Sequence, residues 1–528
     1  IDIKFKDQGR QLAHYHTMAK NQYNWLDALN NINFVTEATN VLIQEQLSYS
    51  VNDELIAYQS KYEMFNVDQR NAFDRITQRI ENTTFEGRST CFFLHGPAGT
   101  GKTFVYNTIA NYFRSQSKIV LCVASSGIAA LLLVGGRTSH SQFKIPLTLD
   151  DRSTINIAPI SAKGVLFKNT ALIIWDEVPM QNRRCFEVVD RLFQDVHENR
   201  TLFGGVPVIF GGDFAQIAPV IKNADRSQIV DASIRQSYIW HETDVIHLRE
   251  NMRVRGASPN NAHYKDWLYN MTYTREMQNT SIPLPHYIYN THSLDDLIKK
   301  VYPVVVLADS INRRQRLYKS AILTTRNDTA DELNRKILDK LPGTALHLLT
   351  ADEAVSSPDD RNNELFQVSQ EYLQTLNPSN LPPARLTLKV GCIVMLLRNI
   401  NAEAGLCNGT RLMVKEIGSY VLKVAVLKEI NSGVEQIEMI PRIILESNED
   451  DYPFTLRRTQ FPVRLSYAMT INKSQEQSLQ YVGVDMRYSV FSHGQLYVAM
   501  SRSTRVDTIY VLHPADALAN KVENIVYP

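Results

Sequence analysis

The stretch "FFLHGPAGTGKTF" at residues 92–104 restricts the fold more than any other part of the chain. It matches the pattern G-x-x-x-x-G-K-[ST] and lies between an apolar strand-like run and a helix-like run. Glycines let backbone N–H groups close around phosphate oxygens, and a helix N-terminus favours negative charge. The stretch therefore predicts a phosphate-binding loop in an α/β fold. Nucleotide contacts are expected from Gly96, Pro97, Ala98, Gly99, Thr100, Gly101, Lys102 and Thr103.

Two carboxylates follow the apolar run "LIIW" further along the chain. At the tip of a strand, Asp176 can hold Mg²⁺ together with the hydroxyl of Thr103, and Glu177 can polarise an attacking water. Lys102 is expected to reach the β- and γ-phosphates. The alternative for the two carboxylates is an acidic pair that caps a following helix. Their position after a phosphate-binding loop favours the catalytic interpretation.

Three later residues are candidates for contacts with the terminal phosphate. Gln216 follows the strand-like run "PVIFGG" and could orient water, although a structural loop amide would look the same. Arg253 and Arg502 are candidates for stabilising transition-state charge, with surface arginines as the alternative. Arg502 would come from a second core across a cleft, so nucleotide binding could control closure of that cleft.

Short apolar runs alternate with helix-like segments in two regions, which predicts α/β cores with parallel sheets and helices on both faces. The expected units are an accessory or linking segment at 1–64, a first core at 65–255 with a small insertion near 144–165, a helical connector at 256–320, a second core at 321–389 and 461–528, and a β-rich insertion at 390–460.

The composition gives little further guidance. The net charge of +1 means that a nucleic-acid partner would need local clusters of Lys and Arg. Five cysteines without a C-x-x-C pair argue against a disulfide framework or a structural zinc site. No run is apolar and long enough to span a bilayer, and no signal peptide is recognisable. Because the chain starts at Ile1, we expect it to be a segment of a longer protein.

Eight motifs in order carry a resemblance to a known family: "FNVDQRNAF", "GPAGTGKT", "SSGIAALLLVGGRTSHSQFKIP", "IIWDEVPM", "GGDFAQIAPV", "ENMRVRG", "AMTINKSQEQS" and "GQLYVAMSR". Over roughly 65–512 the chain resembles a superfamily 1B DNA helicase of the petite-integration-frequency (Pif) type. The resemblance implies two RecA-like cores, an SH3-like insertion at 390–460, and Gln69 as the amide that reads adenine. It also implies ATP-dependent 5′-to-3′ movement on single-stranded DNA, unwinding of duplexes with a 5′ tail, and action as a monomer on DNA.

A finer resemblance lies in "LKVGCIVMLLRNINAEAGLCNGTRLMV", "IPRI", "TQFPVRLSYAMTINKSQ" and "VFSHGQLYVAMSR". These are similar to the helicase part of Helitron-type rolling-circle transposon proteins. That similarity implies a nuclease domain N-terminal to the helicase in the same polypeptide. The residues given contain no His-hydrophobe-His motif followed by a pair of tyrosines, and "HYH" at 14–16 is interpreted as a polar surface run. Together with low cysteine use, the DNA-directed resemblance leads us to expect a nuclear location.

Single-strand binding requires backbone contacts and stacking surfaces. By the resemblance, DNA-facing residues in the first core are Ser125, Ser126, His140 and Phe143, with Phe143 stacking on a base; the alternative for Phe143 is a core aromatic. In the second core the corresponding residues are Thr325, Asn327, Thr470, Asn472 and Lys473. The basic run "RRTQFPVR" at 457–464 is either a further DNA contact or a solvated strand edge.

Two positions depart from the family pattern. Glu476 stands where the family motif K-S-Q-G-Q has glycine, which would suit a positive φ or a close approach of DNA or phosphate. We expect Glu476 among the nucleotide-contacting residues, where its charge would weaken DNA coupling or unwinding. Ala215 stands where many relatives have arginine, which removes one phosphate contact.

Two other classes of protein remain as alternatives. An AAA+ remodeller or a metabolic kinase would share the phosphate loop, but an AAA+ protein would need a helical lid with its own sensor arginine. A degenerate helicase fold that clamps DNA without hydrolysis is the second alternative. DNA-stimulated ATPase activity would separate it from an active enzyme.

Overall fold

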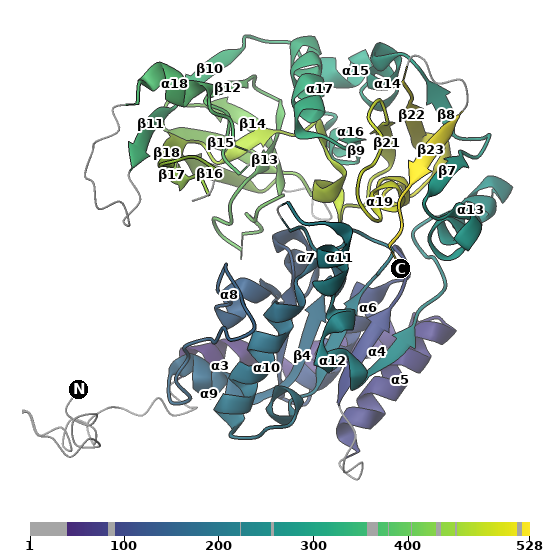
Figure 1. Ribbon diagram of the computed structural model, residues 1–528, viewed down its shortest axis with the longest axis vertical. Helices are drawn as coiled ribbons and strands as arrows, with labels where there is room; N and C mark the ends of the chain where they lie inside the picture. Colours follow the sequence, from purple (N-terminus) through teal and green to yellow (C-terminus); the bar gives the residue numbers. More distant parts are fainter. Residues whose placement is uncertain are drawn as a thin grey trace, which may run out of the picture.

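A computed structural model describes residues 40–82, 90–221, 223–254, 258–355, 368–378, 380–402, 404–428, 435–448, 451–514 and 520–527. They form two α/β cores and a β-rich insertion (Figure 1), with the first core below, the second core above it and the insertion at the upper left. No helix among these residues combines the length and apolar character needed to cross a membrane. All five cysteines are buried and free.

The first core contains a six-stranded parallel sheet in the order β3-β2-β4-β5-β1-β6. Its strands are β1 (Cys91–His95), β2 (Ile119–Ala124), β3 (Arg137–Thr138), β4 (Thr170–Asp176), β5 (Val208–Gly212) and β6 (Thr243–His247). One face is covered by α5 (Val67–Glu81) and α6 (Lys102–Arg114), and the other by α9 (Ala162–Lys168) and α10 (Arg183–His197). The strands β1, β2 and β5 are buried along their whole length, as apolar runs between two helical layers must be.

The predicted accessory segment at 1–64 is only partly within the described residues. Its described end forms α3 (Val41–Leu47) and α4 (Val51–Glu63), and α4 packs on α6 of the first core. Tyr58 of α4 stacks on Phe73 of α5, and Tyr62 packs edge-on against the same ring. Residues 40–63 are therefore part of the first core, because their aromatic side chains complete its packing. Residues 1–39, including "HYH", lie outside the described residues.

The second core contains a five-stranded parallel sheet in the order β20-β9-β21-β22-β8. Its strands are β8 (Tyr289–Thr291), β9 (Ser320–Thr324), β20 (Ala468–Thr470), β21 (Tyr481–Asp485) and β22 (Ile509–Leu512). The flanking helices are α13 (Pro259–Tyr273), α14 (Leu294–Val301), α15 (Val304–Ala308), α16 (Arg314–Tyr318), α17 (Asn327–Lys340) and α19 (Gln495–Ser501). An antiparallel pair, β7 (Thr280–Pro283) with β23 (Lys521–Asn524), extends this core.

The prediction that 256–320 is a helical connector was wrong in part. This segment supplies β8, the edge strand of the second sheet, and β7. An edge strand is covered on fewer sides, so β8 is short and partly exposed, and it lacks the apolar run that marks a buried strand.

The insertion is larger than the predicted 390–460. It runs from β10 (Leu346–Leu349) to β19 (Val463–Leu465) and includes α18 (Gln370–Thr375). Five antiparallel strands have the order β16-β15-β14-β13-β19, and smaller sheets pair β11-β18-β17 and β10-β12. The remaining bounds are β11 (Ala351–Val355), β12 (Arg385–Leu388), β13 (Ile393–Leu396), β14 (Arg411–Ile417), β15 (Val421–Val426), β16 (Ile437–Pro441), β17 (Ile443–Glu446) and β18 (Thr455–Gln460). Within the described pairings β16 and β19 end the order without pairing with each other, so the SH3-like barrel is not confirmed.

Candidate active site between the two cores

The phosphate-binding loop occupies the turn between β1 and α6. Gly99 and Gly101 have φ of 87° and 82°, in the left-handed region that favours glycine. A Cβ atom at Gly99 would clash with Arg253, and one at Gly101 would clash with Gln69. Neighbouring side chains therefore leave no room for a Cβ atom at Gly99 or Gly101, and the loop backbone has the curvature needed to surround an anion. Lys102 is buried, and its ammonium group donates to the carbonyl of Gly96 at 2.7 Å.

The two predicted carboxylates lie where β4 ends. Burial raises the pKa of Asp176 to about 6 and that of Glu177 well above its usual value, and the carboxylate of Glu476 adds to both shifts. Lys102 and the hydroxyl of Thr103 act in the opposite direction on Asp176. Glu177 itself has φ of 54°, a strained backbone that is typical of functional sites. Buried carboxyl groups crowded in this way favour a cation beside them.

Two arginines, Arg253 beside the phosphate-binding loop and Arg502 of the second core, line the same cavity as Glu177. Arg502, in the second core, is almost completely buried, and its Nε donates to the carbonyl of Val498 at 3.0 Å. Arg253 donates through Nη1 to the carbonyl of Ser501 at 3.2 Å. Burial and the nearby Arg502 lower the pKa of Arg253 to about 10. Two neighbouring cations favour an anion beside them, and in this structure the carboxyl groups of Glu476 and Glu177 attract Arg253.

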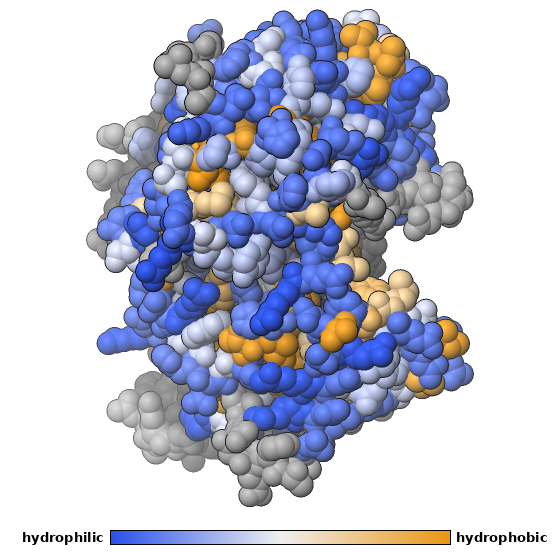
Figure 2. Space-filling view, turned by 90° about the vertical axis from the view of Figure 1, so that its right-hand side faces the viewer, coloured by the Kyte–Doolittle hydropathy of each residue, from blue (hydrophilic) through white to orange (hydrophobic). Residues whose placement is uncertain are grey.

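A cavity of about 950 Å³ joins these groups between the cores and the insertion. In the space-filling view a notch on one side separates the two halves of the molecule (Figure 2). The cavity lining includes Gly99, Gly101, Lys102, Thr103, Glu177, Gln216, Arg253, Glu476 and Arg502. Gln216 is buried with its Oε1 lacking a protein partner. The structure thus brings the predicted catalytic residues together in one place.

Gln69, the predicted adenine reader, has both polar atoms bonded within the protein. Its Nε2 donates to the carbonyl of Thr100 at 3.1 Å, and its Oε1 accepts from the backbone N–H of Asn66 at 3.2 Å. The second bond belongs to a capping box that starts α5. Gln69 therefore supports the phosphate-binding loop in this structure, and reading of adenine stays a prediction.

Phe143 is not a stacking surface for DNA. The side chain is fully buried. Its ring centroid lies 5.3 Å from that of Trp175 and 5.9 Å from that of Phe193, whose centroid is 5.1 Å from that of Phe167. It is the last residue of the short helix α8 (Ser139–Phe143), which turns it toward the core. The prediction was wrong because polar neighbours in a five-residue helix do not reveal which face is buried.

The other predicted DNA contacts in the first core lie near the surface at the carboxyl ends of strands. Ser125 uses its hydroxyl to donate to the carbonyl of Glu177 at 2.7 Å, and Ser126 caps α7 (Gly127–Leu132) by accepting from Ala129. His140 is half-buried, and burial lowers its pKa. Ser125 therefore links the expected DNA surface directly to the backbone of Glu177, one of the two predicted catalytic carboxylates.

The second-core contacts also gather at strand ends. Asn327 is exposed at the start of α17, and Thr470 and Lys473 line a small pocket with it. Asn472 accepts from Gln495 of α19 at 3.2 Å. Thr325 is buried, and its hydroxyl donates to the carbonyl of Tyr488 at 3.3 Å, so it is less accessible than predicted.

One inter-core link was not predicted. The hydroxyl of Tyr497 in α19 donates to Asp213 at 2.9 Å and accepts from the backbone N–H of Ala98 at 2.8 Å. It thereby ties the second core to the phosphate-binding loop. Both Tyr497 and Asp213 stand in quoted motifs, but no local pattern around either residue indicates that they meet across 284 positions.

Comparison with protein-family models shows which proteins the chain is similar to. A model described as PIF1-like helicase matches residues 64–282, and a model for the 2B domain of DNA helicase Pif1 matches residues 371–417, within the insertion. Over these residues the chain is similar to the Pif1-like helicase family. Among curated relatives, Pif1 of a Psychrobacter species is 26% identical over 473 residues, and PIF1 of Danio rerio is 26% identical over 447 residues. The alignments cover 80% and 82% of this Pif1-like chain but only 65% and 60% of those relatives.

Solved Pif1 structures share the fold of this Pif1-like chain. A Bacteroides Pif1 helicase in complex with ADP-AlF3 and ssDNA has a TM-score of 0.59 at 22% identity, covering 87% of this chain and 94% of that one. Pif1 helicase from Candida albicans has a TM-score of 0.58 at 22% identity, with coverage of 85% and 94%. The likeness confirms the α/β fold with two RecA-like cores. A second α/β core in place of a helical lid also removes the AAA+ alternative.

Proposed function

We propose that this chain is an ATP-dependent DNA helicase that moves 5′ to 3′ on single-stranded DNA and unwinds duplexes bearing a 5′ tail. The observation that carries the proposal is the shared cavity, in which Arg502 of the second core faces the phosphate-binding loop of the first. Hydrolysis in such a cleft changes the attraction between the cores, and a change in that attraction moves them relative to each other.

The residues fit a magnesium nucleotide. The hydroxyl of Thr103 is near enough to Asp176 to lower the pKa of that carboxyl group, and the buried carboxyl groups beside it favour a positive partner. Mg²⁺ held by Thr103 and Asp176 would neutralise phosphate charge when bound. Lys102 binds the phosphates, and Arg253 and Arg502 stabilise charge that develops on the terminal phosphate. Glu177 accepts a proton from water, and Gln216 orients that water through its unpartnered amide oxygen.

Strand displacement with ATP and Mg²⁺ tests the proposal. We expect a duplex with a 5′ single-stranded tail to be unwound, a duplex with only a 3′ tail to remain intact, and Lys102→Ala to abolish both ATPase and unwinding. Unwinding from the 3′ tail alone would overturn the direction. If the parent protein shows no ATPase activity that is lost in Lys102→Ala, a clamp that binds DNA without hydrolysing ATP becomes the better interpretation.

We also propose that this chain is the helicase part of a rolling-circle transposase, with a nuclease domain in the same polypeptide, and that it acts as a monomer. The support is the resemblance of the second-half motifs around 389–415 and 459–502 to Helitron-type proteins. The full-length transcript should encode a His-hydrophobe-His motif and a tyrosine pair upstream.

Mass photometry on a 5′-tailed duplex tests the monomer and should show one copy of the protein per DNA. One solved neighbour is described as two coordinating Pif1 helicases at forked dsDNA, and two copies on the DNA would contradict the monomer.

A further inference from the structure

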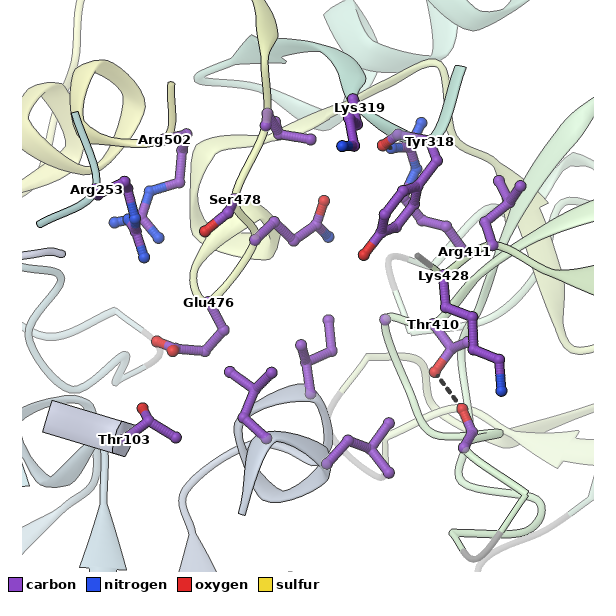
Figure 3. A pocket seen from close by; sticks show the side chains of 18 of the residues that line it. Thr103, Arg253, Tyr318, Lys319, Thr410, Arg411, Lys428, Glu476, Ser478 and Arg502 are labelled. Carbon is purple, nitrogen blue, oxygen red and sulfur yellow. Dashed lines mark hydrogen bonds between the residues drawn. The ribbon is translucent and has the colours of Figure 1, made fainter. Parts of the chain in front are cut away.

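The helix α19 of the second core reaches the first core at both of its ends. Gly494 caps its start and Arg502 caps its end. Figure 3 shows Arg502 beside Arg253 in the nucleotide cavity, so the end of the helix lies at the candidate active site. Its start, at His493 and Gly494, touches residues 213–217 of the first core, which we call the Gln216 loop.

Both ring nitrogens of the buried His493 are bonded to backbone groups. Its Nδ1 accepts from the N–H of Tyr527 at 2.7 Å, and its Nε2 lies 2.8 Å from the carbonyl oxygen of Phe214. Because a carbonyl oxygen can only accept, Nε2 carries the proton and the ring is neutral. Burial lowers the pKa of His493, which favours the same neutral form. The ring therefore joins the second core to the backbone of the Gln216 loop in one fixed tautomer.

The Gln216 loop is held from both cores. Gly494 has φ of 71°, and a Cβ atom there would lie 2.5 Å from the carbonyl oxygen of Ala215 and 2.6 Å from that of Gln216. Any side chain in place of this glycine would therefore displace the loop. In the first core, the ring of Phe214 stacks on that of Phe93, with centroids 4.9 Å apart. The peptide between Phe214 and Ala215 is thus fixed by a side chain in one core and by a hydrogen bond from the other.

Gln216 has space on both sides of its loop. Its Oε1 has no partner among the described residues, so no hydrogen bond to this atom fixes the direction of the amide. The residue lines the nucleotide cavity and also a second cavity of about 70 Å³, whose lining includes His493, Tyr527 and Pro179. If the loop lost its bond to His493, the amide would be able to turn into this smaller space, away from a water that attacks the terminal phosphate.

We propose that His493 is a positioning residue for ATP hydrolysis: its Nε2–H holds the carbonyl of Phe214 and keeps Gln216 aimed at the nucleotide cavity while the two cores are in contact. The inference rests on the proposed helicase function and names a residue that couples contact between the cores to the hydrolytic step. A rotation of the second core that breaks this bond releases the loop, so hydrolysis depends on closure of the cores.

Steady-state ATPase with a saturating single-stranded thymidine oligonucleotide tests this role. We expect His493→Leu to lower kcat about tenfold, because Gln216 no longer orients the attacking water in most molecules. The KM for ATP should stay within about twofold, since the phosphate-binding loop keeps its own contacts. His493→Gln can still donate to the carbonyl of Phe214 through its amide nitrogen, and should keep kcat within about threefold of the parent value.

A double variant tests whether His493 acts through Gln216. Gln216→Ala should lower kcat, and adding His493→Leu should lower it less than about twofold further, because residues that act as a unit are not additive. A second measurement does not depend on turnover. A fluorescent non-hydrolysable ATP analogue should bind His493→Leu as tightly as it binds the parent protein, because only the orientation of water has changed.

His513→Leu is the matched control. His513 is buried in the same core, and its Nε2 bonds the side chain of Asn290 at 2.7 Å, within that core. The substitution removes a buried imidazole without touching the Gln216 loop, and should leave kcat within about twofold of the parent value.

A kcat of His493→Leu equal to that of the parent would overturn the positioning role. An equal loss in His513→Leu would do the same by showing general weakening of the second core, and a further tenfold loss in the double variant would show that His493 does not act through Gln216. If the parent unwinds 5′-tailed DNA and His493→Leu does so at the same rate, only this inference fails. If the parent shows no ATPase activity that is lost in Lys102→Ala, the proposed function fails and the positioning role fails with it.

Discussion

At the scale of single residues, the fully buried Phe143 shows how a side chain in a family motif can serve packing alone. Removing its ring in Phe143→Ala should lower the free energy of unfolding by about 3–5 kcal/mol, because a cavity opens among the aromatic rings of the first core. Urea denaturation would measure the loss. The milder Phe143→Leu should fold and bind single-stranded DNA with unchanged affinity; a tenfold loss of affinity in that folded variant would restore the stacking interpretation.

His95 gives the first core a pH dependence. Burial lowers its pKa to about 4, and the opposing attraction of Asp213 is smaller. Between about pH 4 and 6.5 the unfolded chain therefore binds more protons at this residue than the folded protein does. The contribution of His95 to the free energy of unfolding is present above this window and is lost as pH falls through it. Between pH 7 and pH 5 the loss should be about 2 kcal/mol. His95→Gln should flatten the pH dependence of urea unfolding, and an unchanged slope would contradict the assignment.

The local chemistry of a site is the part that sequence reveals best. Lys102 was predicted because it stands in the glycine-rich loop, and Asp176 and Glu177 were predicted because they stand at the end of an apolar strand. The link between Tyr497 and Asp213 was not predicted, because neither residue carries a local sign of its partner. Proximity across hundreds of residues is a property of the fold.

At the scale of elements, β18 is held by an arginine without solvent contact. Arg458 forms a fully buried ion pair with Asp352 of β11 at 2.7 Å and donates to the carbonyls of Pro382, Leu373 and Leu376. Arg458→Met would leave Asp352 buried and unpaired, which costs about 3–5 kcal/mol. Limited proteolysis should show cleavage of the insertion before that of the cores.

The adjacent Arg457 provides the control for this prediction. Its pairs with Glu446 and Glu353 are exposed to solvent, so Arg457→Met should change stability by less than about 1 kcal/mol. Adding Asp352→Leu to Arg458→Met should recover part of the loss, since the unpaired charge disappears. Equal proteolysis of the Arg457 and Arg458 variants would show that the buried pair does not stabilise the insertion.

Strand prediction succeeded where strands are buried and failed at edges. The apolar runs before the phosphate-binding loop, before Glu177 and in "PVIFGG" correspond to β1, β4 and β5, because burial between two helical layers requires apolar residues throughout. The sequence of β8 is "YNT", which carries no such requirement. The limits of the insertion were missed for the same reason, since β10 and β11 are mostly exposed.

At the scale of the whole molecule, a substitution at Tyr497 tests whether the contact between the two cores supports nucleotide binding. Tyr497→Phe would leave the N–H of Ala98 and the carboxylate of Asp213 without this partner, at about 1–3 kcal/mol each. We expect the KM for ATP to rise about tenfold with a smaller change in kcat, measured by steady-state ATPase. Tyr264→Phe is the matched control: its buried hydroxyl also bonds α19, through the carbonyl of Met500 at 2.8 Å, but does not contact the loop. An equal rise of the KM in both variants would show that the change comes from a general weakening of the packing around α19, not from the loop contact.

The interrupted second core has a consequence for how the protein is made. All six strands of the first sheet precede Leu248, so that core can form while synthesis continues. Among the described residues the interior strand β9 pairs with β20 and β21, and the nearer of these along the chain starts at Ala468. At about 5–20 residues per second, a ribosome would need roughly 7–30 s to deliver it. During that interval β9, which is buried along its whole length in the folded protein, has no neighbouring strand to pair with. We therefore expect the second core to be the part of the nascent chain that most needs a chaperone.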